Sequence, residues 1–157
     1  MCLNGLNLKA GFGVLMLVAL NSAFAQSCPG GTTRVTSGTP ADGGTAGGNF
    51  SGFISNALIC ATRGSDRWQE WHGGSSQLWD YKLGASSTMD PSKQVGTWSS
   101  ANGSSATVTH TYGGTSYVWA ICRTNSSAPY DYTMVSLTGG TITGVKISTV
   151  TSVSACP

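Results

Sequence analysis

Charged side chains are scarce in this chain of 157 residues, of which only 9% are Asp, Glu, Lys or Arg. The formal net charge is +2, and it falls to +1 when Lys9 is removed. The basic residues are scattered and form no dense patch of the kind that neutralises phosphates. We therefore expect no nucleic acid among its partners. So low a charge content fits a wall or extracellular protein better than a cytosolic one.

The sequence also lacks the short motifs of nucleophilic and metal-dependent catalysis. It contains neither G-x-S-x-G nor H-E-x-x-H, and Asp42 and Asp131 show no calcium-loop spacing. Two histidines with scattered carboxylates do not make a zinc site. We therefore expect no cofactor and no bound metal.

No apolar run reaches the roughly 20 residues that span a bilayer. A shorter run, from Gly11 to Leu20, follows Lys9 and precedes Ala23-Phe24-Ala25, the small-x-small pattern that signal peptidases cut. Residues 1–25 are therefore expected to be a signal peptide. An uncleaved anchor is the alternative, as is lipid attachment at Cys28, although the preceding residues fit a lipoprotein box poorly. We expect a secreted or periplasmic protein without membrane insertion after cleavage.

Cysteines are few and widely spaced. Cys2 leaves with the signal peptide, so that four remain: Cys28, Cys60, Cys122 and Cys156. An even number in a small exported chain indicates two disulfides, and four cysteines allow three pairings. We favour Cys28–Cys156, which joins the two ends, and Cys60–Cys122, in which each cysteine follows an Ile in a strand-like run. A metal site is the alternative, but no two cysteines are close and neither histidine is near one.

Short β-type segments separated by glycine turns dominate the rest of the chain. Residues 26–49 contain mostly Gly, Thr, Ser, Pro and Ala; no core can form from them, so we expect a flexible arm or a long loop held at Cys28. Residues 50–157 are expected to be a single all-β domain, because no apolar period of 3.6 lasts three turns. The expected strands are 53–61, 66–72, 77–83, 95–100, 106–112, 115–123, 130–138 and 141–150.

About eight short strands joined mostly by hairpins predict an antiparallel meander. Closing this meander into a barrel removes the exposed edges that invite aggregation. A two-sheet sandwich is the alternative. Two disulfides are expected to stabilise the small core.

The stretch Asp66–Leu83, DRWQEWHGGSSQLWDYKL, holds three of the five tryptophans and one of the two histidines. It is typical of a β-hairpin that turns at residues 73–76. A loop of two or four residues gives the same register, which places six side chains on one face: Trp68, Glu70, His72, Gln77, Trp79 and Tyr81. Trp71 lies on the opposite, polar face with Asp80 and is the best candidate for an exposed ring.

Two further turns, Asn102-Gly103 and Gly113-Gly114, predict the faces of the following strands. The expected interior side carries Val95, Val108, His110, Tyr112, Tyr117, Trp119 and Ile121. His110, opposite Tyr117, is expected at the margin of this interior. Trp98 is expected on the other side.

The combination W-Q-E-x-H (Trp68–His72), L-W-D-Y-K (Leu78–Lys82) and V-G-T-W (Val95–Trp98) resembles a group of small exported bacterial proteins with no assigned activity. The resemblance covers roughly Ile59 to Trp119 and implies no function. Separately, the G-T-W of residues 96–98 resembles the G-x-W that opens lipocalin and avidin barrels. In those families it stands on the first strand, whereas about three expected strands precede it here.

Aromatic and polar residues concentrated on one hairpin favour ligand recognition. We expect a non-catalytic domain that binds a small molecule or glycan through an aromatic-rich surface. The ligand-contacting residues would be Trp68, Trp71, Trp79 and Tyr81 by stacking, and Glu70, His72 and Asp80 by hydrogen bonding. The alternative is that these rings simply fill a small core.

Two other functions stay open. Glu70 and His72 lie two residues apart on a strand, about 7 Å apart on one side, and burial would raise the pKa of Glu70 toward the range of a general acid. Glu70 would equally be satisfied by an ion pair with a neighbouring basic residue. A subunit of an extracellular fibre or matrix, formed by self-assembly, is the other alternative, with little support for strand donation by residues 26–49.

Overall fold

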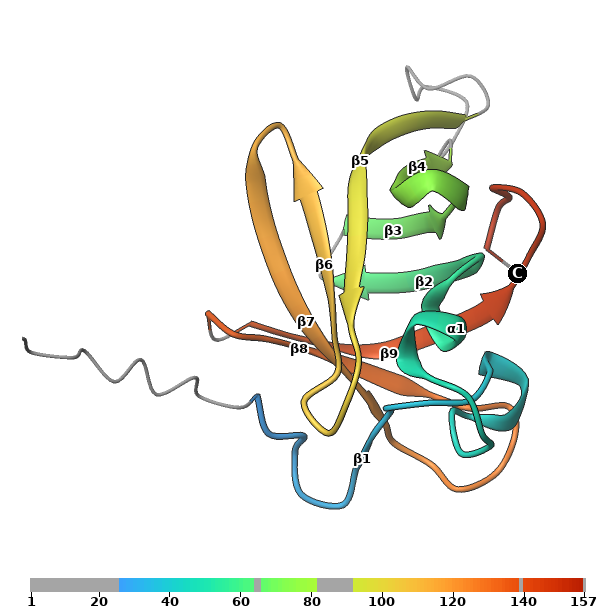
Figure 1. Ribbon diagram of the computed structural model, residues 1–157, viewed down its shortest axis with the longest axis vertical. Helices are drawn as coiled ribbons and strands as arrows, with labels where there is room; N and C mark the ends of the chain where they lie inside the picture. The colour runs from blue at the N-terminus through green and yellow to red at the C-terminus, as the bar shows by residue number, and fades with distance from the viewer. Residues whose placement is uncertain (1–25, 64–65, 82–91, 139, 157) are drawn as a thin grey trace, which may run out of the picture.

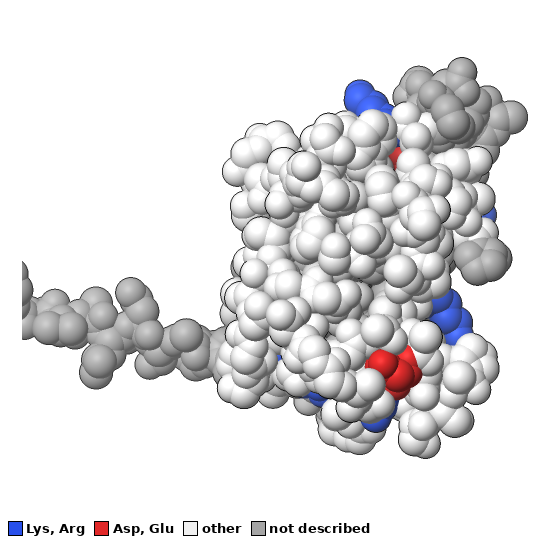
Figure 2. Space-filling model, turned by 45° about the vertical axis from the view of Figure 1, so that its right-hand side comes forward, with Lys and Arg blue, Asp and Glu red and all other residues white. Residues whose placement is uncertain are grey.

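A computed structural model describes residues 26–63, 66–81, 92–138 and 140–156 (Figure 1). The expected signal peptide, residues 1–25, lies outside the described residues. Within the described ranges no helix has the length and hydropathy of a membrane span. Figure 2 shows a face that is largely free of charged side chains, in keeping with the composition.

The chain forms short elements in the following order: β1 (Thr33–Arg34), the 3-10 turn η1 (Pro40–Asp42), α1 (Phe50–Ile54), β2 (Ala57–Arg63), β3 (Asp66–His72), the 3-10 turn η2 (Gly74–Ser76), β4 (Gln77–Tyr81), β5 (Ser92–Ala101), β6 (Thr107–Tyr112), β7 (Thr115–Arg123), β8 (Tyr132–Ser136) and β9 (Thr141–Thr149). Strands β2 to β9 are antiparallel, each hydrogen-bonded to the next, and β2 also pairs with β9. The predicted all-β class and the closed eight-stranded barrel are thus confirmed (Figure 1).

One end of the barrel is filled by α1 and its aromatic side chains. Phe50, Phe53 and Ile54 are fully buried in the main core, where Phe53 packs edge-on against Tyr132. This corrects the expected strand over 53–61, which begins only at Ala57. The Asn49 side chain accepts a hydrogen bond from the Gly52 N–H at 2.8 Å and caps a helical turn, which the apolar composition alone did not indicate.

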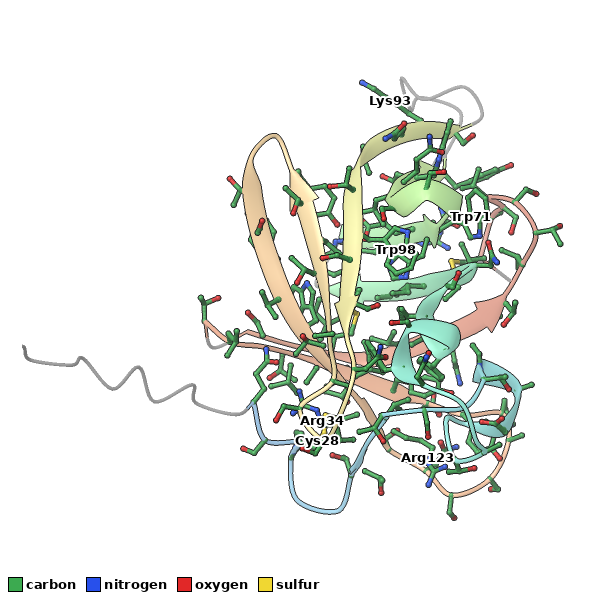
Figure 3. All side chains as sticks on the ribbon, viewed as in Figure 1. Cys28, Arg34, Trp71, Lys93, Trp98 and Arg123 are labelled. Atoms are coloured by element: carbon green, nitrogen blue, oxygen red, sulfur yellow. A yellow bond between two sulfur atoms is a disulfide. The ribbon has the colours of Figure 1, made fainter. Side chains whose placement is uncertain are left out.

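Residues 26–49 pack along the barrel. The Val35 N–H donates to the Ile121 carbonyl at 2.9 Å, and the Val35 side chain belongs to the core. The Arg34 guanidinium donates a hydrogen bond to the Ala106 carbonyl in the β5–β6 connection. Arg34 and Cys28 are both labelled in Figure 3. The segment is held at Cys28 by its disulfide to Cys122, contains β1 and η1, and contributes Val35 to the core.

Both favoured disulfide pairings are wrong. The structure joins Cys28 to Cys122 and Cys60 to Cys156, with Cα–Cα separations of 5.7 and 5.8 Å. Cys60 lies on β2 and Cys122 on β7, and β9 and β8 lie between these strands in the barrel. Three strand spacings amount to about 14 Å, far beyond the reach of a disulfide. Two disulfides are typical of an oxidising compartment.

The β3–β4 register is shifted by one residue from the expected one. Glu70 pairs with Asp80, Trp71 with Trp79 and His72 with Leu78. The connection therefore has five residues, 73–77, which is an odd number, whereas two or four were expected. Two serines in it adopt positive φ angles of 58° and 62°. Because side chains alternate along a strand, this shift turns Trp79 to the outer face and brings Asp80 inside.

The register predicted from the Gly113-Gly114 turn is confirmed, whereas the register predicted from the Asn102-Gly103 turn is wrong. Gly113-Gly114 joins β6 to β7 with His110 opposite Tyr117, as predicted. The β5–β6 connection spans residues 102–106, not two residues, so Trp98 pairs with His110 and faces inward against the core (Figure 3). His110 is fully buried and not at the margin of the interior.

Candidate binding cavity

A cavity of about 700 Å³ lies inside the barrel at the end opposite α1, where the β6–β7 and β8–β9 turns are found. Inward-facing side chains of β3, β4, β6, β7 and β8, together with the β8–β9 turn, form its wall. The lining residues are Trp68, Glu70, Asp80, Tyr112, Tyr117, Trp119, Ser136, Thr138 and Gly140. Strand alternation places the residues of β3, β4, β6, β7 and β8 there, since these positions face inward in the observed registers, whereas Thr138 and Gly140 belong to the β8–β9 turn.

Four of the nine lining residues are aromatic. Trp68 and Trp119 meet edge to face with ring centroids 5.9 Å apart, and Tyr112 and Tyr117 lie at the same separation with their planes tilted by 59°. Trp119 is only 5% exposed, whereas Tyr117 is 44% exposed. The rings therefore extend from the core to solvent, and a bound molecule could contact them along the whole depth of the cavity.

Two carboxyl groups project into the same space. Glu70 on β3 lies directly opposite Asp80 on β4, and the Tyr112 hydroxyl donates to Glu70 Oε1 at 2.5 Å. Burial raises the pKa of Glu70 to about 7, helped by the charge of Asp80 and opposed by the Tyr112 hydrogen bond. The pKa of Asp80 is also raised, again by burial. Glu70 therefore holds a proton through most of the acidic range.

Behind Glu70, two fully buried histidines connect the cavity to α1. His72 Nδ1 lies 3.0 Å from the Ile54 carbonyl, and His72 Nε2 lies 2.9 Å from His110 Nε2. A carbonyl can only accept, so the proton of His72 must be on Nδ1, and His110 must then donate from its own Nε2. The tautomers of both rings are thus set by one backbone carbonyl. Trp98 stacks on His72 with ring centroids 5.0 Å apart.

This arrangement leaves His110 Nδ1 as an acceptor facing the cavity. Glu70 Oε2 lies 3.4 Å away, and the Tyr112 hydroxyl, already donating to Glu70, lies 3.3 Å away. Burial lowers the pKa of His72 to about 4, and burial together with His72 lowers the pKa of His110 well below 6.5. Both imidazoles are therefore neutral near pH 7, and among the described side chains near His110 Nδ1 only a protonated Glu70 is left to donate to it.

Of the seven expected ligand-contacting residues, the structure gathers Trp68, Glu70 and Asp80 around the cavity. His72 is buried behind His110 and does not line it, so Glu70 and His72 are linked only through a third side chain. The other three are on the outer face of the barrel and half-buried: Trp71, Trp79 and Tyr81. Trp71 lies over Gly73 and is therefore not the freely exposed ring that was expected.

Six lining residues were missed as site residues by the sequence reasoning. For Tyr112, Tyr117 and Trp119 a signal existed, because the Gly113-Gly114 register placed all three on the interior side. The β8 residues and those of its turn, Ser136, Thr138 and Gly140, carry no comparable signal, since small polar residues are common throughout the chain.

Within the described part of the chain, no group of three or more His, Cys, Asp or Glu side chains could hold a metal ion. Comparison with known proteins gave no match to a family model, to a curated protein or to a solved structure.

Proposed function

We propose that this protein is exported and binds a small organic molecule or a short glycan in the barrel cavity, without catalysing a reaction. The observation that carries the proposal is the convergence of four aromatic rings with the polar groups of Glu70, Asp80 and Tyr112 around about 700 Å³ of space. Ligand sites of proteins commonly occupy about 300–1,000 Å³ and combine mostly apolar walls with a few polar groups. The site is thus inside the barrel, not on the outer surface of the β3–β4 hairpin.

A second candidate, a small hydrolase, is favoured by one specific observation. Glu70, with its pKa raised to about 7, lies opposite a second carboxyl group, and two carboxyls with different pKa values can share the roles of acid and base. The sequence analysis paired Glu70 with His72 as acid and base, whereas here the second catalytic group would be Asp80. Hydrolysis of p-nitrophenyl glycosides with a bell-shaped pH profile, abolished by Glu70→Gln, would support it.

Assembly into a fibre has less support from the fold. Each of the strands β2 to β9 pairs with at least two neighbours, so none of them is a free edge along which another chain could add. Light scattering of the purified protein over a range of concentrations tests this alternative.

The binding proposal is tested with N-phenyl-1-naphthylamine, a neutral dye that fluoresces in apolar sites. We expect saturable binding that Tyr117→Ala weakens about tenfold, because one ring of the wall is lost. Tyr81→Ala is the matched control: it removes the same ring from the outer face and should leave dye affinity unchanged. Equal effects of the two substitutions, or no saturable binding, would show that the cavity is not the site.

A further inference from the structure

We propose that the ligand of this cavity is a small organic cation, held between the aromatic rings and the carboxylates of Glu70 and Asp80. This inference rests on the proposed binding function and specifies the chemistry of its ligand. Three independent features of the cavity support it: the sign of its charge, an unpaired buried oxygen, and the nature of its wall.

The charged groups that line the cavity are both acidic. No Lys or Arg is among its lining residues, and the nearest candidate along the sheet, Lys93, is exposed and forms no ion pair with Asp80 within 4.0 Å, although the two are backbone partners. In Figure 3 the Lys93 side chain extends away from the barrel.

Other basic side chains make their contacts away from the cavity. Arg34 donates to the Ala106 carbonyl at the opposite end of the barrel, and Lys146 forms an ion pair with Asp131. Arg67, on the outer side of β3, is exposed. Among the side chains that the structure describes, therefore, no Lys or Arg forms an ion pair with either carboxyl group of the cavity.

One oxygen in the cavity has no hydrogen-bond partner. Glu70 Oε2 is buried, its side chain is only 9% exposed, and its distance to His110 Nδ1 is 3.4 Å, longer than an ordinary hydrogen bond. Glu70 also lies directly opposite Asp80, a placement in which two like charges repel each other. A proton on Glu70 relieves this repulsion, and a bound cation would replace that proton.

The wall indicates an organic cation. A cation is attracted to the face of a Trp or Tyr ring when it lies within about 6 Å of the centroid, and four such rings surround this space. A sugar would also stack on the rings, but it would leave the facing carboxyls without a counter-charge. An ammonium group satisfies both the rings and the carboxylates.

Exchange of a proton for a cation makes binding pH-dependent. The groups that face Glu70 are Asp80, Tyr112 and His110, with His72 behind. Both histidines are neutral between pH 6 and 8, and burial raises the pKa of the Tyr112 phenol, so it stays protonated. Glu70 is the group that changes charge in this interval, so affinity for the cation should rise about tenfold from pH 6 to pH 8.

The experiment measures displacement of N-phenyl-1-naphthylamine by choline and by 3,3-dimethyl-1-butanol, in which carbon replaces the charged nitrogen. At pH 8 we expect choline to bind at least about tenfold more tightly than the neutral alcohol, and this preference to shrink at pH 6. Glu70→Gln should reduce the preference for choline and remove its dependence on pH between 6 and 8, while the Asp80 carboxylate keeps part of the preference. Asp131→Asn, which removes one acidic group on the outside of the barrel, should change neither the preference for choline nor its pH dependence.

The outcomes separate the two proposals. If the dye and the alcohol bind in a Tyr117-dependent way but choline binds no better than the alcohol, the cation inference is wrong and the binding cavity stands. Displacement of the dye by calcium chloride and not by choline would also overturn it, in favour of a metal ion. If none of the probes binds, both proposals fail.

Discussion

Replacing Glu70 with Gln should stabilise the protein at neutral and alkaline pH. An ionised Glu70 is buried beside Asp80, and no Lys or Arg side chain that the structure describes forms an ion pair with it. The amide of Gln is neutral and nearly the same size. It can still accept from the Tyr112 hydroxyl, and it can donate to His110 Nδ1, which no other described side chain does when Glu70 is ionised.

The size of the effect follows from the pKa of Glu70, which rises from its ordinary value of 4.5 to about 7 in the folded protein. The unfolded chain therefore binds fewer protons than the folded one in this window, and the free energy of unfolding falls as pH rises through it. At about 1.4 kcal/mol per pH unit, the loss approaches about 3 kcal/mol. The two histidines act in the opposite sense, because their lowered pKa values cost stability as pH falls below 6.5.

The difference between parent and variant isolates the contribution of Glu70, since both proteins contain the same histidines. Urea denaturation at pH 4.5, 6, 7 and 8 should show nearly equal stability at the lowest pH. A gain of about 2–3 kcal/mol for Glu70→Gln is expected at the highest, or roughly 5–10 °C in Tm. Asp131→Asn is the control for loss of an acidic group outside the cavity. Stability differences that do not change between pH 4.5 and 8 would refute this account of Glu70.

Two further predictions concern the barrel. A Cβ at Gly96 would lie 2.1 Å from the Thr111 carbonyl oxygen, so Gly96→Ala should cost more than about 3 kcal/mol or prevent folding, whereas Gly74→Ala, with nothing within 4 Å, should cost less than about 1 kcal/mol by urea denaturation. The bond between Cys28 and Cys122 closes a loop with a sequence separation of 94 residues, so replacing both cysteines with Ser should cost about 4–5 kcal/mol. A non-reducing digest that links Cys28 to any other cysteine would contradict this pairing.

Part of the site could be read from local sequence. Gly113-Gly114 permits the tight turn that pairs Tyr112 with Thr115, and strand alternation then directs Tyr112, Tyr117 and Trp119 to one side. The same alternation puts Trp68, Glu70 and His72 on one face of β3. These assignments succeeded because they depend on a short turn and a period of two, both of which are local properties.

The register of the β3–β4 hairpin could not be predicted from the local sequence. Gly73-Gly74-Ser75-Ser76 is compatible with loops of several lengths, and the five-residue loop requires positive φ angles at serines, which sequence preference disfavours. One residue of register decides whether Trp79 or Asp80 faces the cavity. The packing of the barrel interior selects between these registers, and no short stretch of sequence contains that information.

The sequence by itself therefore determined the all-β class, the alternation that leads to a closed barrel, and the presence of paired cysteines in a chain of low charge. Only the tertiary structure decided which cysteines pair and which side chains meet. Barrel closure separates Cys60 from Cys122 by two strands and brings Glu70 and Asp80 to the same cavity as the rings of β6 and β7. The physical reason is that strand periodicity is set by neighbouring residues, whereas contacts across a barrel depend on the register of every strand between them.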